Sequence, residues 1–275
     1  MGTFKITGGN SLGGEIIPQG AKNEALQIIC AVLLTNEKVI LNNVPNIRDV
    51  NKLIDLLRGL GVEVIKINEN KYSFDASAIN LKYLETEDFY AKATSIRGSV
   101  MILGPLLARF GKGTLPQPGG DKIGRRRLDT HFIGLQKLGA EFKYDPDKKS
   151  FKVVGKNLNG NYMLLEEASV TGTANILMAS VLAKGITTIF NAACEPYLIQ
   201  LCKMLVRMGA KITGIGSNLL TIEGVKSLTG TEHTMLADMI EVGSFIGLAA
   251  MTQSEIIIKN VSLEDLGLIP TVFKR

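Results

Sequence analysis

The chain is poor in the residues that usually organise small or metal-bound folds. Its 275 residues include no tryptophan, only two histidines and three cysteines, and aromatic residues make up 6%. Cys30, Cys194 and Cys202 are odd in number and lack metal-ligand spacing, which argues against both a disulfide framework and a structural zinc site. We therefore expect an aliphatic core, no metal, no cofactor and a reducing, cytoplasmic location.

Long hydrophobic runs are also missing. The longest, 25–34 and 100–108, are about half of the ~20 residues that a membrane-spanning helix needs. The first nine residues, MGTFKITGG, lack the apolar run of a signal peptide. The sequence predicts buried helices at these runs and no membrane partner.

No strong charge excess is present. The chain has 31 basic and 26 acidic residues, a net charge of +5. A nucleic-acid-binding protein usually shows a larger and more clustered basic excess, so an anionic small molecule is an equally good partner. With 45% hydrophobic and 21% charged residues, the chain is typical of a globular protein with room for one or two domains.

What the chain does have is an internal repeat. One phrase with Leu-Gly or Met-Gly in its middle occurs three times, around Gly61, Gly139 and Gly209. Each glycine follows an amphipathic helical pattern and precedes a strand pattern, so we expect it to end its helix with a positive φ. The three copies span 57–64, 135–142 and 205–212.

The first half of each unit recurs as well. It is a helix of small and apolar residues with little polar surface, which must be surrounded by other elements. Strands follow in three copies, and an asparagine occupies the equivalent position in each copy: Asn43, Asn191 and Asn260. We expect the apolar helices at 23–34, 96–108, 173–183 and 242–251, and the strands at 39–44, 186–192 and 256–261.

The repeat predicts an α/β fold with apolar helices inside and sheets outside. A fourth unit begins near Asp238 and stops at Arg275, inside its expected second helix. This pattern predicts one complete part and the beginning of another, as in a fragment of a longer protein.

Three segments carry residues suited to chemistry. The first, 19–23, places Lys22 at the start of an apolar helix, where a cation and exposed backbone N–H groups suit a phosphate or carboxylate. An exposed turn lysine is the alternative. The third, 168–175, opens another apolar helix with small hydroxyl residues, which favours an anion or ordinary N-capping by serine or threonine.

The second segment, 118–131, interrupts the repeat with a glycine-rich loop. Asp121 is a candidate proton donor, and three arginines, 125–127, have the fork geometry that matches a diphosphate. A solvated basic turn or a nucleic-acid patch is the alternative, but no aromatic residues are interleaved for stacking. His131 lies in the next helical pattern and is expected to be structural.

Taken together, these segments resemble the enolpyruvyl transferase family, in particular its branch that uses UDP-N-acetylglucosamine. The resemblance runs from Phe4 to the C-terminus. It rests on five ordered landmarks: GAKN at 20–23, NVPNIRDV at 43–50, LGPLLARFGKG at 103–113, PGGDKIGRRRLDTH at 118–131 and NAACEP at 191–196.

The resemblance implies an inside-out α/β barrel architecture, built from βαβαββ units with helices inside. One domain would span 21–235, and residues 1–20 with 236–275 would form part of a second. The family has six units, so most of the second domain would be absent.

The implied reaction moves the enolpyruvyl group of phosphoenolpyruvate to the 3′-hydroxyl of UDP-N-acetylglucosamine and releases phosphate, the first committed step of peptidoglycan synthesis. Lys22 and Arg126 would hold phosphoenolpyruvate, Arg97 would bind a substrate anion, and Asn23 would contact the sugar nucleotide and the reacting centre. Lys22 and Asp121 would be catalytic. The uridine and diphosphate site would comprise Arg126, Arg127, Leu128, Asp129, Thr130, Ser169, Val170 and Thr171.

Two residues depart from the family pattern. Asp121 stands where the family usually has a loop cysteine, and a carboxylic acid cannot form the thioether that the antibiotic fosfomycin makes with that cysteine. We expect the full-length enzyme to be insensitive to fosfomycin. Met239 replaces a more usual arginine in Asp238-Met-Ile-Glu241, which predicts the loss of an interdomain salt bridge.

The family's general base and further substrate arginines would lie beyond residue 275, so the chain alone is expected to be inactive. The full-length protein is expected to be a monomer. The shikimate 3-phosphate branch of the family and a non-catalytic UDP-sugar-binding module are the alternatives. An RNA-binding role rests on the arginine cluster alone.

Overall fold

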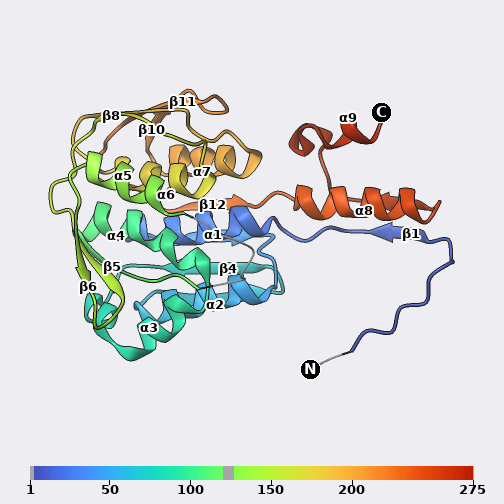
Figure 1. Cartoon of the computed structure of the whole chain (residues 1–275), viewed down its shortest axis with the longest axis horizontal. Coiled ribbons are helices and arrows are strands. Elements are labelled where there is room, and N and C mark those ends of the chain that lie inside the picture. Colours follow the sequence, from blue (N-terminus) through green and yellow to red (C-terminus); the bar gives the residue numbers. More distant parts are fainter. Residues whose placement is uncertain (1–2, 120–126, 275) are drawn as a thin grey trace.

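The computed structural model describes residues 3–119 and 127–274 and shows three similar helix-and-sheet units followed by a smaller C-terminal part (Figure 1). We call residues 21–235 the three-unit body. Each unit combines an apolar helix, a strand that follows it, an amphipathic helix and two further antiparallel strands. The fold is therefore mixed α/β and built from repeated units, as the sequence predicts.

The first unit has a four-stranded sheet of order β12-β2-β4-β3. Its strand β12 comes from the far end of the body and pairs parallel with β2, so the last strand of the body completes the first sheet. The elements are α1 (Lys22–Ala31), η1 (Val32–Leu34), β2 (Val39–Asn42), α2 (Arg48–Gly59), β3 (Glu63–Asn68), β4 (Lys71–Asp75) and β12 (Thr231–Thr234).

The third unit repeats this sheet with its own strands, in the order β8-β9-β11-β10. Here β8 takes the place of β12 and pairs parallel with β9. The elements are β8 (Tyr162–Leu164), α6 (Val170–Ser180), β9 (Ile186–Phe190), α7 (Pro196–Arg207), β10 (Lys211–Thr213) and β11 (Leu219–Glu223).

The second unit has a three-stranded sheet, β5-β7-β6, in which both pairings are antiparallel. Its apolar helix is divided into the 3₁₀ segment η3 and the α-helix α4. The elements are η2 (Leu81–Glu85), α3 (Glu87–Thr94), η3 (Arg97–Ile102), α4 (Leu103–Phe110), β5 (Lys112–Pro116), α5 (Asp129–Lys137), β6 (Glu141–Asp145) and β7 (Ser150–Val154).

The repeated glycines end their helices in the same way. Gly61, Gly139 and Gly209 have φ of +97°, +100° and +104°. After α2, the Gly61 N–H donates to the Arg58 carbonyl and the Val62 N–H to the Leu57 carbonyl, both at 3.0 Å, and the bonds after α5 and α7 have the same spacing. This is the Schellman pattern of helix termination. The predicted positive φ is confirmed at all three positions.

The repeated asparagines share a second backbone feature. Asn43, Asn191 and Asn260 have φ of +56°, +59° and +58°. The side-chain amide of Asn43 donates to the Met235 carbonyl at 3.0 Å, and that of Asn191 donates to the Leu165 carbonyl at 2.9 Å. Both acceptors directly follow the parallel neighbour strand, so Asn43 and Asn191 each fasten the turn after their own strand to that neighbour.

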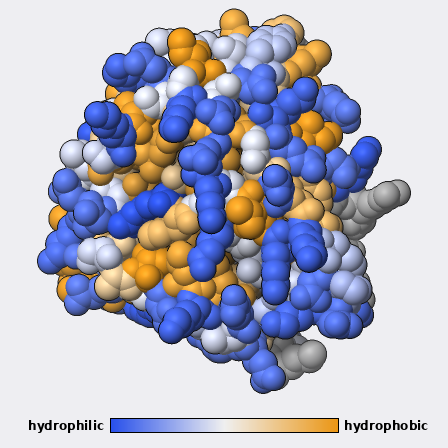
Figure 2. Space-filling model, turned by 90° about the vertical axis from the view of Figure 1, so that its left-hand side faces the viewer, coloured by the Kyte–Doolittle hydropathy of each residue, from blue (hydrophilic) through white to orange (hydrophobic). Residues whose placement is uncertain are grey.

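The apolar helices form the interior of the body and the sheets lie outside them (Figure 1). Most of α1 is fully buried, and nine of the eleven residues of α6 are buried. Figure 2 shows the end of the body farthest from α8, where hydrophilic side chains are spread over the surface with smaller hydrophobic areas between them. Such a surface suits the outward faces of half-buried sheets.

The C-terminal part lies at one end of the body (Figure 1). Its helix α8 is apolar, yet Val242 is its single buried residue among those described. Strand β1, from the N-terminal segment, pairs parallel with β13 beside it. The elements are β1 (Gly13–Ile16), α8 (Met239–Met251), β13 (Glu255–Ile258), η4 (Leu263–Leu266) and α9 (Ile269–Phe273).

Within residues 3–119 and 127–274, no helix has the length and apolar character needed to cross a membrane. The same residues contain no cluster of three or more histidine, cysteine, aspartate or glutamate side chains placed to hold a metal ion.

Candidate active site

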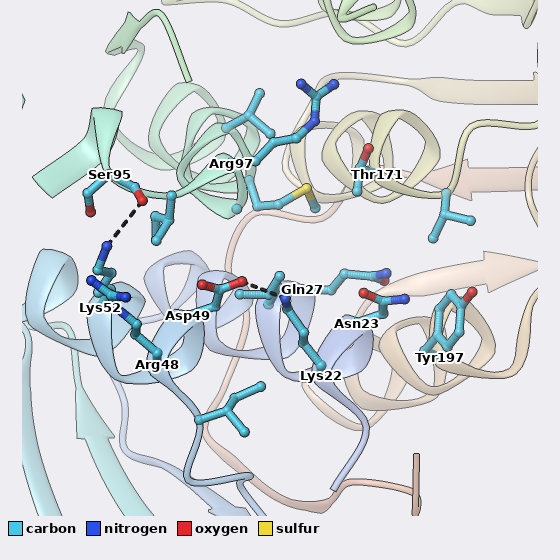
Figure 3. Close-up of a pocket in the computed structure, with 17 residues that line it drawn as sticks. Lys22, Asn23, Gln27, Arg48, Asp49, Lys52, Ser95, Arg97, Thr171 and Tyr197 are labelled. Atoms are coloured by element: carbon cyan, nitrogen blue, oxygen red, sulfur yellow. Dashed lines mark hydrogen bonds and ion pairs between the residues drawn. The ribbon is translucent and has the colours of Figure 1, made fainter. Parts of the chain in front are cut away.

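A cavity of about 860 Å³ opens where the first turns of α1, α2 and α6 meet the start of η3. It brings together segments from all three units and the first turns of four helices, since Tyr197 at the start of α7 lines it as well. Figure 3 shows its principal polar side chains: Lys22, Asn23, Gln27, Arg48, Asp49, Lys52, Ser95, Arg97, Thr171 and Tyr197.

The cavity has a positive lining. Lys22, Arg48, Lys52 and Arg97 line it, whereas Asp49 is the single carboxylate among its described lining residues. The Lys22 ammonium is paired with Asp49 at 2.5 Å, and about two-fifths of each side chain is exposed. Because the cations outnumber this carboxylate, the cavity suits a ligand with more than one negative charge.

Backbone contacts hold two of these cations in place. The Lys52 ammonium donates to the Ser95 carbonyl at 3.2 Å, which joins α2 to the segment before η3. The Arg97 guanidinium donates to the Arg127 carbonyl at 3.3 Å, just after the end of the glycine-rich loop.

The two ends of the cavity differ in charge (Figure 3). Arg48, Lys52 and Ser95 lie at one end, and the neutral side chains of Asn23, Gln27, Thr171 and Tyr197 lie at the other. Lys22, Asp49 and Arg97 lie between them. This arrangement suits a ligand, or a pair of ligands, with a charged part and a neutral polar part.

The start of α1 is held by a carboxylate from a distant segment. Asp238 accepts a hydrogen bond from the Lys22 N–H at 3.0 Å, and its other oxygen accepts from the Ile240 N–H at 2.9 Å. One side chain therefore caps both α1 and α8. An anion at a helix N-terminus interacts favourably with the helix dipole, so Asp238 stabilises both starts.

The start of α6 shows ordinary N-capping. The Ser169 hydroxyl accepts from the Gly172 N–H at 3.2 Å. Thr171, two residues on, lines the cavity and lies 3.2 Å from Nε2 of His131. The capping interpretation thus holds for Ser169, while its neighbour Thr171 is available at the cavity wall.

His131 supports Thr171 from within the protein. Its Nδ1 lies 3.0 Å from the amide nitrogen of Asn175, which also donates to the Val100 carbonyl. Since that nitrogen is a donor, Nδ1 accepts, and a neutral ring then donates from Nε2 to Thr171. Burial, with a smaller effect of the Arg97 charge, lowers the pKa of His131 to about 4. His131 is structural, as the sequence analysis expects.

A second buried network lies behind α1. His233 on β12 is 2.7 Å from a carboxylate oxygen of Glu24, whose other oxygen accepts from the Leu236 N–H at 3.0 Å. Arg207 donates to the second ring nitrogen of His233. Burial is the main cause that raises the pKa of Glu24. The network ties the helix that carries Lys22 and Asn23 to the strand that leads into Asp238.

Five of the site residues predicted from the sequence line the cavity: Lys22, Asn23, Arg97, Val170 and Thr171. Five others do not: Arg127, Leu128, Asp129, Thr130 and Ser169. Arg127 pairs with Asp129, and the Thr130 hydroxyl donates to Glu167 at 3.3 Å. Asp121 and Arg126 lie outside the described residues, and the roles of all twelve remain predictions.

The structure adds lining residues that the sequence analysis did not select: Gln27, Arg48, Asp49, Lys52 and Tyr197. Arg48 and Asp49 belong to the NVPNIRDV landmark, so a signal was present for them. Tyr197 follows the NAACEP landmark, and its side chain hydrogen-bonds with Asn23. Burial, with a smaller contribution from Glu195, raises the pKa of Tyr197.

Residues 6–273 match the family described as EPSP synthase (3-phosphoshikimate 1-carboxyvinyltransferase). The chain belongs to this family. Among curated relatives, it is 66% identical over 275 residues to a UDP-N-acetylglucosamine 1-carboxyvinyltransferase of Bacteroides thetaiotaomicron, covering 100% of this chain and 63% of the relative. It is 47% identical to the Treponema denticola protein of the same name, covering 97% of this chain and 61% of that protein.

Solved structures agree on the fold. The enolpyruvyl transferase NikO from Streptomyces tendae matches 87% of this chain and 55% of its own, with a TM-score of 0.74 and 21% identity. An EPSP synthase from Acinetobacter baumannii matches 93% of this chain and 57% of its own, with a TM-score of 0.71 and 18% identity. The chain thus has the fold of this family and spans about 63% of the length of the curated relative from B. thetaiotaomicron.

Proposed function

We propose that this chain forms the greater part of an enzyme that transfers the enolpyruvyl group of phosphoenolpyruvate to the 3′-hydroxyl of UDP-N-acetylglucosamine. The observation that carries the proposal is the cavity of about 860 Å³, whose described lining residues include four cationic side chains and one carboxylate. Both substrates are anionic, and one also has a neutral sugar. The identity of 66% to a relative named for this reaction supports the choice of substrates.

The positions of Lys22, Asn23 and Arg97 in the cavity support the proposed roles of these three residues. Lys22 and Arg97, between the two ends of the cavity, bind the phosphate and carboxylate of phosphoenolpyruvate. Asn23, at the neutral end, contacts the sugar near the hydroxyl that reacts. Arg126 joins Lys22 at phosphoenolpyruvate, and residues 126–130 with 169–171 hold the uridine and diphosphate. Fixed cations and positioned substrates lower the barrier because they cost no reorganisation during the reaction.

Asp121 is the proposed proton donor. Protonation of the methylene carbon of phosphoenolpyruvate makes the adjacent carbon electrophilic, and the sugar hydroxyl attacks that carbon and loses its proton to a base. Removal of a proton from the new methyl group then expels phosphate and restores the double bond. The proposed base and further arginines belong to the part of the relatives' length that this chain does not span.

The proposal includes the architecture and setting of the enzyme. Residues 21–235 form an inside-out α/β barrel domain, and residues 1–20 with 236–275 belong to a second domain. The buried helices α1 and α6, with sheets outside them, support this arrangement. The full-length enzyme acts in the cytoplasm as a monomer in peptidoglycan synthesis, without a cofactor.

Phosphate release tests the reaction. With phosphoenolpyruvate present, a protein of the relatives' full length is expected to release phosphate when UDP-N-acetylglucosamine is added, and the 275-residue chain alone is expected not to. Release with shikimate 3-phosphate instead would favour the reaction in the family's own description. Binding of the UDP-sugar by a naturally short chain without turnover would favour a non-catalytic binding module.

The proposal also predicts insensitivity to fosfomycin. A carboxylate at position 121 has no sulfur for the thioether, so the full-length enzyme should keep its activity after incubation with the antibiotic. An Asp121→Cys variant should show time-dependent inactivation with a covalent mass increase. Covalent inactivation of the unmodified protein would contradict the prediction.

A further inference from the structure

Gln27 is a buried polar side chain at the neutral end of the cavity. It lies one helical turn after Asn23 on α1, on the same face of the helix, and is 1% exposed. Within residues 3–119 and 127–274, neither its amide nitrogen nor its amide oxygen has a hydrogen-bond partner. Burying an unpaired donor and acceptor destabilises a fold, so this glutamine calls for an explanation.

The neighbouring polar groups already have partners. Asn23 is hydrogen-bonded with Tyr197, Thr171 contacts His131, and the Lys22 ammonium is paired with Asp49. The cationic side chains at the other end offer donors only, which suits an anion. Gln27 offers one group that donates and one that accepts, and an anion satisfies only the first.

Neighbouring hydroxyls on a sugar ring satisfy both the donor and the acceptor of the Gln27 amide. Each hydroxyl donates and accepts, and two adjacent ones present both functions to one carboxamide. We propose that Gln27 is a binding residue for the sugar of the acceptor substrate, its amide turning from its buried position to the sugar hydroxyls when the ligand enters. This inference rests on the proposed function, since it assigns the sugar to the neutral end of the cavity.

A matched pair of ligands and variants tests the role of Gln27. UDP-N-acetylglucosamine carries the sugar and UDP does not. Gln27→Met keeps the length of the side chain and removes both polar atoms, while Gln136→Met changes an exposed glutamine on α5 and serves as control. Calorimetric titration should show about tenfold weaker binding of UDP-N-acetylglucosamine to Gln27→Met, a typical effect of losing hydrogen bonds to a ligand. Binding of UDP should be unchanged, and Gln136→Met should bind both ligands like the unmodified chain.

Thermal unfolding separates binding from folding. Without ligand, Gln27→Met should unfold at the same temperature as the unmodified chain or higher, because an unpaired buried amide has been removed. A lower unfolding temperature with unchanged affinity for UDP-N-acetylglucosamine would overturn the inference and make Gln27 a structural residue. Equal affinities for this ligand in the unmodified and Gln27→Met chains would overturn it as well.

A measurement on the unmodified chain covers the case in which the variant does not fold. The NMR signals of the Gln27 side-chain amide should move when UDP-N-acetylglucosamine is added and stay in place with UDP. Signals that stay in place with both ligands, while UDP-N-acetylglucosamine binds, would overturn the role of Gln27 alone. If the unmodified chain binds UDP-N-acetylglucosamine no more tightly than UDP, the proposed acceptor substrate is wrong as well.

Discussion

Both histidines of the chain are buried in side-chain networks, and His131 lies next to the cavity. It holds Thr171 through one ring nitrogen and meets Asn175 through the other. A protonated ring has no acceptor for the Asn175 amide. The orientation of a cavity-lining hydroxyl thus depends on a ring that stays neutral.

The low pKa of His131 predicts a pH dependence of folding stability. Its pKa falls from 6.5 to about 4 on burial, so the unfolded chain binds more protons between these values. The free energy of unfolding should rise as the pH increases from about 4 to about 6.5, by about 3 kcal/mol from this group. Urea unfolding across this range should show the rise, and a His131→Gln variant should show a flatter profile. An identical slope in both proteins would contradict the assignment.

Lys22 carries the prediction for anion binding. Lys22→Ala should weaken binding of phosphoenolpyruvate at least tenfold, because a charge-assisted hydrogen bond to a ligand anion contributes about 1.5–3 kcal/mol. The variant should fold like the unmodified chain, since the ammonium is partly exposed and pairs with Asp49. Lys137→Ala on the exposed surface of α5 is the control. Unchanged affinity in Lys22→Ala would place the anion elsewhere.

Cavity-lining residues were predictable where an apolar helix begins. Lys22 and Thr171 each lie at the first turn of an apolar helix, and that pattern is visible along the chain. Arg48 and Lys52 were missed because they lie on the amphipathic helix α2, where basic residues usually face water. Only the packing of α2 beside α1 and η3 makes them part of a cavity.

At the level of elements, the three helix-ending glycines have the same backbone but different surroundings. A Cβ at Gly61 would lie 2.5 Å from the Ala78 carbonyl oxygen, whereas at Gly209 nothing lies within 4 Å. The similar sequence phrases predicted the same helix end at each glycine, and this was correct. The neighbour at Gly61 was not predictable, because it comes from the segment after β4.

This contrast predicts different costs for the same substitution. Gly209→Ala should lower the free energy of unfolding by about 1–2 kcal/mol, the cost of a left-handed backbone with a side chain. Gly61→Ala has the same backbone cost and adds a clash with a carbonyl, so its loss should be larger. Chemical unfolding of both variants measures the difference. Equal losses in the free energy of unfolding would show that the segment after β4 moves aside without cost.

Strand β3 shows where the pattern along an element was ambiguous. Val62 and Val64 alternate as a half-buried strand should, but Ile65 and Ile67 fall on the other face and are about half exposed. The register of β3 against β4 shifts between Lys66 and Asn68. A bulge of this kind changes which face a residue occupies. That shift lies after Ile65, which pairs in regular register with Ser73, so the alternation was imperfect because an isoleucine occupies the exposed face of a regular stretch.

At the scale of the whole molecule, the order of the units was predictable, but the pairing of the last strand of the body with the first sheet was not. Repeated phrases predicted three units, yet nothing local indicates that β12 completes the sheet of β2, about 190 residues earlier in the chain. The same long-range pairing brings Asp238 to the start of α1. The position of the cavity therefore depends on a long-range pairing between the ends of the body.

Asp238 provides a test of this connection. Asp238→Ala removes the cap of α1 and of α8 together, so it should lower the free energy of unfolding by about 1–2 kcal/mol per cap. Hydrogen exchange should speed up at the N–H groups of Lys22 and Ile240. Asp238→Asn keeps an acceptor oxygen and should lose less. Unchanged exchange at Lys22 would show that α1 starts without help from the C-terminal part.

The most direct test of the account is a calorimetric titration of UDP-N-acetylglucosamine into this chain at several salt concentrations. We expect saturable binding that weakens as salt increases, because cations that line the cavity bind the charged groups of the ligand. We also expect that shikimate 3-phosphate does not compete. Saturable binding of shikimate 3-phosphate with none of UDP-N-acetylglucosamine would contradict the account.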